Sequence, residues 1–260
     1  MGSSQVQGPL WGAAARDWAE IAEPGQIPFY EAAFAAIGLS NATDLLDVGC
    51  GAGLALQLAH KAGASTSGID AAEGLLAIAK ERLGDADLRH GDIEDLPWAD
   101  STFNAVTAFN SVQYATNPTA ALTEIKRVTK PGSPVAIATW GTVEQCEMRV
   151  VLAAIGSLLP PPPPGAGGPF ALAAPGVLEQ LVGTAGLSPE QVIDVPTPYI
   201  YPDLATAVRG QMSAGPARKA IEVAGRDALR AALIDAFATV TLPDGSIRLD
   251  NVFKVVVART

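Results

Sequence analysis

The chain has 260 residues, of which 48% are hydrophobic and 17% charged, a composition that excludes a disordered protein and suits one α/β domain with insertions. Its formal net charge is -10, and its few Lys and Arg residues lie singly or in pairs, such as Lys126-Arg127 and Arg218-Lys219. Affinity for nucleic acids depends largely on cations that neutralise phosphates, so this charge argues against DNA or RNA as a partner.

Two cysteines, Cys50 and Cys146, and two histidines, His60 and His90, lie apart in the sequence. A structural zinc site needs about four clustered ligands, so we expect no metal. The N-terminus, Met1-Gly2-Ser3-Ser4, lacks the basic start and apolar run of a signal peptide, and no stretch approaches the roughly 18 to 20 apolar residues of a membrane-spanning helix. We therefore expect a cytoplasmic monomer or homodimer without membrane insertion.

The first half of the chain alternates between predicted helices and buried strands. Residues 10–37 read as helical pieces interrupted by prolines, and they form either core or a mobile N-terminal lid. The following elements are a strand at 44–48, a helix at 53–62, strands at 65–69, 87–90, 104–109 and 134–139, and helices at 72–83 and 118–129. This order predicts an open parallel sheet with helices on both faces and a ligand site beyond the carboxyl ends of its strands.

The second half has a different composition. Five prolines, Pro160 to Pro164, are followed by glycines and predict a stiff polyproline stretch with a flexible end. A helix at 175–185 and a strand at 191–200 are predicted to return to the sheet. Residues 203–240 are expected to be helical, with breaks at Arg209-Gly210 and Gly215-Pro216, and a last strand is expected at 247–257 after the turn signal Asp244-Gly245.

A glycine loop, Asp47-Val-Gly-Cys-Gly-Ala-Gly53, joins the first predicted strand to the next helix. Glycines at such a turn let a ligand approach the backbone, and a helix N-terminus offers free N–H groups. Asp70 ends the second strand, where a carboxylate can accept both hydroxyls of a ribose, and Asp92 follows the third strand. An aspartate after a strand is also a common helix cap, and Cys50 reads as a small loop residue.

Other nucleotide and nucleophile motifs are missing. A dinucleotide fingerprint needs glycine at position 54, which is Leu54, and no tyrosine is followed four residues later by lysine. No Gly-Lys pair of a phosphate-binding P-loop and no G-x-S-x-G nucleophile elbow occur. A nicotinamide-dependent reductase is therefore a distant alternative.

Four motifs in order resemble those of class I S-adenosylmethionine (SAM)-dependent methyltransferases, especially the branch that methylates ubiquinone precursors and bacterial secondary metabolites. They are Leu45-Leu-Asp-Val-Gly-Cys-Gly-Ala-Gly53, Gly68-Ile-Asp70, Gly91-Asp-Ile-Glu-Asp-Leu-Pro97 and Phe103-Asn-Ala-Val-Thr-Ala-Phe-Asn110. The resemblance covers about residues 40–140, and the segment from Trp11 to Trp18 also resembles the N-terminus of some bacterial members. Asn104 departs from the family, which usually has Asp there; we expect this to affect packing more than cofactor binding.

The resemblance implies a fold and a division of the chain. We expect a Rossmann-like, seven-stranded, mostly parallel sheet with an antiparallel last strand, helices on both faces and helical cap or lid insertions. Residues 1–260 would form a single class I methyltransferase domain. Within it, the expected parts are an N-terminal helical lid at 1–38, a SAM-binding core at 40–140, and cap insertions around the acceptor site at 141–174 and 202–243.

The resemblance also implies cofactor contacts. Asp47 and the backbone of the loop from Gly49 to Gly53 would hold the methionine part of SAM, and Asp70 the ribose hydroxyls. Asp92 would receive the adenine amino group, with Ile93 against the ring, while Asn110 and Ser111 would lie beside the sulfonium. The full expected set is Asp47, Gly49, Cys50, Gly51, Gly53, Asp70, Ala71, Leu75, Asp92, Ile93, Asn110 and Ser111.

Methyl transfer from a sulfonium needs mainly an acceptor held in line, and good orientation contributes roughly 7 to 11 kcal/mol. The segments expected to roof the acceptor site are apolar and aromatic, which suits an apolar or aromatic small molecule, although core packing explains such residues equally well. The expected acceptor contacts are Trp11, Trp18, Tyr30, Gln113, Tyr114, Trp140, Tyr199 and Arg209. His90, Tyr114, Glu144 and Tyr201 are the candidates for a general base.

Three functions remain open at this stage. The chain could be an active methyltransferase, a SAM-bound enzyme with other chemistry such as a cyclase, or a binding protein that has lost activity. The intact Asp47, Gly49, Gly51, Asp70 and Asp92 argue against the last of these. The sequence does not show whether a methyl group would go to oxygen, nitrogen or carbon, because fold and motif alone do not determine the acceptor.

Overall fold

The structure is a computed structural model that describes residues 2–161 and 168–260. Most of the predicted polyproline stretch and the glycines that follow it fall on residues 162–167 and so lie outside the described residues.

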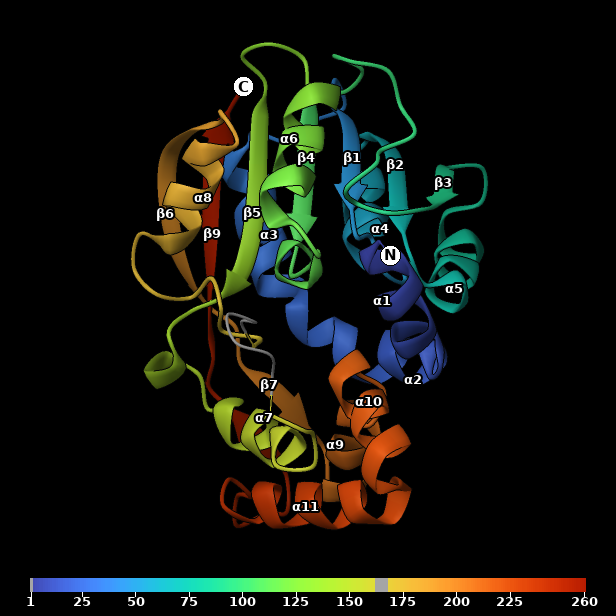
Figure 1. The fold of residues 1–260 in the computed structure, drawn as a ribbon, viewed down its shortest axis with the longest axis vertical. Helices are drawn as coiled ribbons and strands as arrows, with labels where there is room; N and C mark the ends of the chain where they lie inside the picture. The colour runs from blue at the N-terminus through green and yellow to red at the C-terminus, as the bar shows by residue number, and fades with distance from the viewer. Residues whose placement is uncertain (1, 162–167) are drawn as a thin grey trace.

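Seven strands form the central sheet, in the order β3-β2-β1-β4-β5-β9-β6 (Figure 1). β1 to β5 run parallel, whereas β9 runs antiparallel to both of its neighbours, β5 and β6. The strands are β1 (Asp44–Val48), β2 (Ser65–Asp70), β3 (Asp87–His90), β4 (Ala105–Phe109), β5 (Pro134–Trp140), β6 (Ser188–Pro196) and β9 (Val252–Arg259). The predicted fold, a mostly parallel sheet with an antiparallel last strand, is confirmed.

The alternating direction of side chains along the strands explains why helices cover both faces of the sheet. Leu45 of β1 faces the core formed with Phe29 and Leu56, whereas Leu46 faces the core formed with Ile125. Successive side chains of a strand point to opposite faces, so a strand buried on both faces is apolar throughout. The helices that cover the sheet are α3 (Ile27–Ala36), α4 (Leu54–Lys61) and α5 (Glu73–Leu83), and, on the other face, α6 (Pro118–Val128) and α8 (Val177–Thr184).

The remaining elements lie beyond the carboxyl end of the parallel strands, at the lower end of the molecule in Figure 1. The N-terminal elements are α1 (Ser3–Gly12), α2 (Ala15–Asp17), η1 (Trp18–Ala22) and η2 (Glu23–Gln26). The cap consists of η4 (Val143–Gln145), α7 (Arg149–Gly156), α9 (Leu204–Gln211), α10 (Gly215–Ala224), α11 (Arg226–Ala238) and a two-stranded sheet of β7 (Tyr199–Tyr201) and β8 (Ile247–Leu249). α10 packs against α1, which joins the cap to the N-terminal helices.

The predicted strands at 191–200 and 247–257 are wrong in their extent, because each run is divided between two sheets. Pro196 and Pro198 lack the N–H that a ladder needs, so the chain leaves the central sheet there and enters the small one. Asn251 marks the corresponding break between β8 and β9, and its side chain accepts a hydrogen bond from the Met148 amide at 2.9 Å. The predicted break at Arg209-Gly210 is also wrong, since α9 continues to Gln211.

Asn104 packs as expected at the start of β4, far from the carboxyl ends of the strands. Its Oδ1 accepts from the Asp44 amide at 2.7 Å, and its Nδ2 donates to the Ala42 carbonyl at 3.0 Å. An aspartate could accept the first bond but could not donate the second. The amide therefore joins two neighbouring strands.

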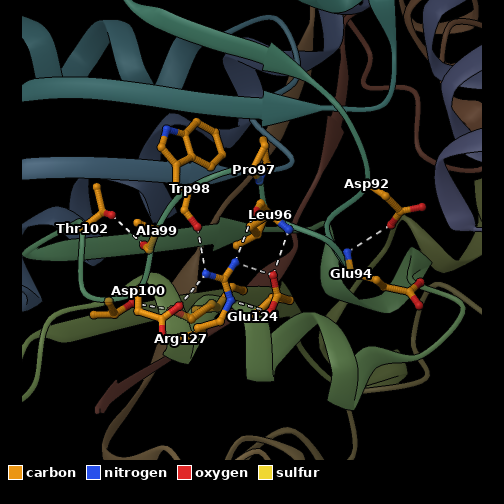
Figure 2. A network of polar contacts seen from close by, with 12 residues as sticks. Asp92, Glu94, Leu96, Pro97, Trp98, Ala99, Asp100, Thr102, Glu124 and Arg127 are labelled. Carbon is orange, nitrogen blue, oxygen red and sulfur yellow. Dashed lines mark hydrogen bonds and ion pairs between the residues drawn. The ribbon is translucent and has the colours of Figure 1, made fainter.

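Arg127 on α6 anchors the loop that follows β3 (Figure 2). It donates to the carbonyls of Leu96 at 2.9 Å and Trp98 at 2.8 Å, to Asp100 at 2.8 Å and to both oxygens of Glu124 at 2.7 Å. Glu124 in turn accepts from the Leu96 amide at 2.9 Å. The two side chains thus replace the backbone pairing that this irregular loop lacks.

Arg127→Ala should lower the free energy of unfolding by about 2 kcal/mol, because it leaves carbonyls and carboxylates without their charged donor. Lys219→Ala is the matched control: it removes an exposed ion pair with Glu222 and should change stability by less than about 0.5 kcal/mol. Denaturant unfolding of both variants measures the difference. Equal changes in the two would contradict a structural role for the Arg127 network.

Candidate functional site

The glycine loop after β1 packs directly against the segment that follows β4. Gly49 has φ +82°, and a Cβ atom built on it would lie 2.4 Å from the Ser111 Cβ, so only glycine fits. Ser111 donates from its hydroxyl to the Val48 carbonyl at 2.7 Å. The ends of β1 and β4 are therefore held together where the chain leaves the sheet.

Asp70 ends β2 and organises two backbone segments. One oxygen accepts from the Gly51 amide and the other from the Ala72 amide, both at 2.8 Å. Burial raises the pKa of this carboxyl, and the two backbone N–H groups oppose the rise. Asp70 therefore fixes the glycine loop and caps the start of α5, while its contact with a ribose stays a prediction.

Asp47 lies near the end of β1 and is 2% exposed. Its Oδ1 accepts from the Thr107 hydroxyl of β4 at 2.7 Å, and within the described residues no Lys, Arg or His forms an ion pair with it. Burial raises the pKa of Asp47 to about 7, against the opposing hydrogen bond from Thr107. A cation beside this carboxylate would return its pKa toward the ordinary range.

A cavity of about 790 Å³, including its opening to solvent, lies at the carboxyl ends of β1, β2 and β4; we call it the central cavity. It is lined by ten of the twelve residues expected to bind the cofactor: Asp47, Gly49, Cys50, Gly51, Asp70, Ala71, Leu75, Ile93, Asn110 and Ser111. Burial raises the pKa of the Cys50 thiol well above its usual value, so Cys50 is a neutral loop side chain as expected.

The other two expected cofactor residues lie outside the central cavity. Gly53 has φ +80°, and a Cβ atom there would lie 2.9 Å from the Ala79 Cβ, so this glycine serves the packing of α4 on α5. The Asp92 carboxylate accepts from Ser3 Oγ and Ser4 N at 2.9 Å and from Glu94 N at 3.0 Å, the last of these drawn in Figure 2. Asp92 thus caps α1 and places this helix beside the cavity.

A second cavity of about 450 Å³, again including its opening to solvent, lies between the central cavity and the cap; we call it the adjoining cavity. Trp11, Trp18, Gln26, Asn110 and Tyr114 line both cavities, so the two spaces meet at these side chains. The other lining residues are Trp140, Met148, Leu152, Ile155, Tyr199, Gln211, Ala214 and Pro216. None of the lining side chains is Asp, Glu, Lys, Arg or His, so this space is uncharged.

Most of the expected acceptor contacts line a cavity. Trp11, Trp18, Tyr30, Tyr114, Trp140 and Tyr199 do so. Arg209 does not: it is 60% exposed and pairs with Asp17 at 2.5 Å on the surface. Gln113 lines neither cavity, and its Nε2 donates to the Oδ1 of Asn110, which itself adopts a left-handed φ of +51°. Asn110 therefore has a fixed side chain on a strained backbone at the junction of the two cavities.

Of the four candidates for a general base, only Tyr114 lies at the cavities. Burial raises the pKa of its phenol above the usual range, so it stays protonated at neutral pH. Tyr201 is buried elsewhere and accepts from Gln211 at 2.9 Å, and burial raises its pKa to about 12. Glu144 is exposed on η4, and the exposed His90 contacts the Ala71 carbonyl at 2.9 Å.

Sequence analysis missed several lining residues. Ser3 and Gln7 come from α1, which begins well before the predicted helical segment, and Glu23 and Gln26 come from η2. Gln26 accepts from the Tyr30 hydroxyl at 2.5 Å. In this segment the sequence signal for a site is weak: polar residues among apolar neighbours around Pro24-Gly25. The lining residues of the adjoining cavity on α7 and α10 belong to no sequence motif.

Raising the pH from about 4 to about 7 should destabilise the protein in the absence of ligand. Asp47 has a folded-state pKa of about 7 against about 3.9 when unfolded, so the native state binds the extra proton in this range and loses stability as it is titrated. The buried Glu23 and Asp70 act in the same direction. Denaturant unfolding at several pH values measures how steeply the free energy of unfolding falls with pH. Asp47→Asn should make this fall smaller, and an unchanged fall would contradict a raised pKa for the buried Asp47.

Within 2–161 and 168–260, no group of three His, Cys, Asp or Glu side chains lies close enough to hold a metal ion. No helix in this part of the chain combines the length and apolar character needed to cross a membrane.

Known proteins resemble this chain in sequence and in fold. Residues 46–137 match a family described as a methyltransferase domain. The demethylmenaquinone methyltransferase of Renibacterium salmoninarum is 36% identical over 103 residues, covering 40% of this chain and 44% of that protein. The malonyl-acyl-carrier-protein O-methyltransferase of Erwinia pyrifoliae is 30% identical over 175 residues, covering 67% and 63%.

In both cases the match spans less than two thirds of the relative's length. The cyclase SpnF shares the fold, with a TM-score of 0.58 and 21% identity over 89% of this chain and 80% of that one. The match over residues 46–137, the sheet order and the glycine loop with its acidic partners make the chain similar to class I SAM-dependent methyltransferases.

Proposed function

We propose that this protein transfers the methyl group of SAM to a small, uncharged, apolar or aromatic acceptor. One observation carries the proposal: the central cavity, built by the glycine loop and its carboxylates, opens into the uncharged, aromatic adjoining cavity. The cavities meet at Asn110 and Tyr114, where the methyl donor and the acceptor would face one another.

The residues of the central cavity suit SAM. Gly51 leaves open space beside the loop, since the nearest described atom to a Cβ atom there would be Glu23 Oε1 at 3.8 Å, and the carboxylates of Asp47 and Asp70 match a ligand with a net positive charge. In this proposal Asp47 and the loop hold the methionine part and Asp70 the ribose. Leu75 and Ile93 would lie against the adenine. Asp92 would act through α1, since its carboxylate already accepts three hydrogen bonds.

SAM supplies a methyl group already activated by a sulfonium, so the chain need only position and shield the acceptor. Trp11 and Trp18 pack edge to face, with ring centroids 4.8 Å apart, and Trp11 packs in the same way on Tyr114 at 5.6 Å. These rings cover the junction of the cavities and exclude water from it. Orientation of this kind contributes on the order of 7 to 11 kcal/mol to a barrier.

The adjoining cavity also limits the acceptor. It has no cation to pair with a carboxylate, and burying an unpaired anion is costly. The relative from Erwinia pyrifoliae is named for a malonyl group, which bears a carboxylate; the present cavity favours a neutral molecule instead. Tyr114 remains protonated and so cannot act as a strong base. The acceptor would therefore attack through a neutral nucleophilic atom or through a hydroxyl that is acidic enough to ionise without a base.

Calorimetric titration with S-adenosylhomocysteine, the product of SAM after methyl transfer, tests the cofactor site. The wild type should bind with micromolar affinity, and Asp70→Ala should weaken binding by at least tenfold, because it removes the ribose contact and frees the Gly51 amide. Asp203→Ala is a matched control: Asp203 also caps a helix, through the Thr206 amide at 2.7 Å, but lies outside both cavities. It should leave affinity unchanged.

Absence of binding to the wild type in this titration would refute the proposed cofactor. Equal losses in the two aspartate variants would mean that Asp70 acts only as a helix cap.

Methyl transfer from isotope-labelled SAM to a panel of small aromatic molecules tests the acceptor. Neutral phenols and amines should be methylated with a kcat/KM at least tenfold above that of matched analogues bearing a carboxylate. Mass spectrometry also separates the alternative chemistry: a methylated product gains one carbon and two hydrogens, whereas a cyclised product keeps its mass. Preference for the carboxylates would contradict the neutral-acceptor proposal.

A further inference from the structure

Glu23 is a buried acid that reaches the central cavity from the N-terminal segment. It begins η2, is 2% exposed and lines the cavity next to the glycine loop. A Cβ atom on Gly51 would lie 3.8 Å from its Oε1. It lies outside residues 46–137, which match the methyltransferase-domain family, and a glutamate is rarely buried unless it is paired.

The two oxygens of Glu23 have different surroundings. Oε2 pairs with Arg82 of α5 at 2.5 Å, and Arg82 also donates to the carbonyls of Ala52 at 2.8 Å and Ala19 at 2.9 Å. Among the described residues, the hydrogen bond that Oε1 accepts is a long one, 3.4 Å from the Leu54 amide. Arg82 therefore fixes the carboxylate in place, while Oε1 retains capacity to accept from a ligand.

The charged side chains that line the central cavity are all acidic. Three carboxylates line it, those of Glu23, Asp47 and Asp70, and no Lys, Arg or His does. Burial raises the pKa of each of them, and the charge of Glu23 further raises that of Asp47. Buried charges of one sign are costly without a counterion, and Arg82 compensates only one. A ligand that brings a positive group between Glu23 and Asp47 would relieve this cost.

We propose that Glu23 Oε1, together with Asp47, binds the ammonium group of the cofactor's amino-acid part. The inference rests on the proposed function and adds a contact from outside the glycine loop. Because η2 connects the N-terminal helices to α3, the same contact would attach that segment to the bound cofactor. Arg82 is the positioning residue, since it touches Glu23 and the loop but does not line the cavity.

Two ligands separate this role from a structural one. S-adenosylhomocysteine carries the ammonium group, whereas 5′-methylthioadenosine has the same nucleoside and sulfur without the amino-acid part. Calorimetry should show that Glu23→Gln raises the Kd for S-adenosylhomocysteine at least tenfold and changes that for 5′-methylthioadenosine less than twofold. The amide still accepts from Arg82, so the fold should be retained.

Glu81→Gln is the matched control. Glu81 also joins the N-terminal segment to α5, through Arg16 at 2.9 Å, but it is exposed and remote from the cavity. Both of its Kd values should match the wild type. The double variant Glu23→Ala, Arg82→Ala removes both buried charges, leaves neither unpaired, and should show the same selective loss for S-adenosylhomocysteine.

Equal weakening of the two ligands, or undiminished affinity of Glu23→Gln for S-adenosylhomocysteine, would overturn the inference. A wild type that binds neither ligand would instead overturn the proposed function, so the two failures are distinguishable.

Discussion

The close approach of the glycine loop to the segment after β4 is the constraint on which the site depends. With φ +82° and a Cβ position 2.4 Å from the Ser111 side chain, Gly49 admits no other residue without movement of one strand end. That contact brings Asp47, Asp70 and Asn110 to one cavity. It also explains why Asn110 adopts φ +51°, because the chain must turn sharply after β4 to pass the loop.

Charge divides the space above the sheet into two parts. The central cavity has three carboxylates, whereas the adjoining cavity has amides, phenols, indoles and aliphatic side chains only. In the proposed function, desolvation favours a cationic cofactor and a neutral acceptor on opposite sides of the Asn110–Tyr114 junction. The cyclase SpnF has the same fold, and a shared fold does not by itself determine the reaction.

The N-terminal segment contributes to both cavities although it adds no described strand to the central sheet. α1 is capped by Asp92, a residue 88 positions from Ser4 along the chain, and Gly8 allows its backbone to pack on the Ala71 carbonyl, only 2.3 Å from where a Cβ atom would lie. The ion pairs Arg16–Glu81 and Arg82–Glu23 attach the residues that follow α1 to α5. Apolar packing of Trp11 on Trp18 and Tyr114 adds to these polar anchors.

The sequence by itself determined the parallel sheet, the glycine loop and most of the lining of the central cavity, because these depend on local signals: apolar strands, glycines at sharp turns, and acids at strand ends. Ten of the twelve expected cofactor residues line the cavity for this reason. Only the tertiary structure decided which acidic side chains face the central cavity. Asp92 is diverted to α1, Glu23 is brought in from η2, and Arg209 is left on the surface with Asp17. These outcomes depend on contacts between segments up to 192 residues apart, and no local pattern of residues encodes such a contact.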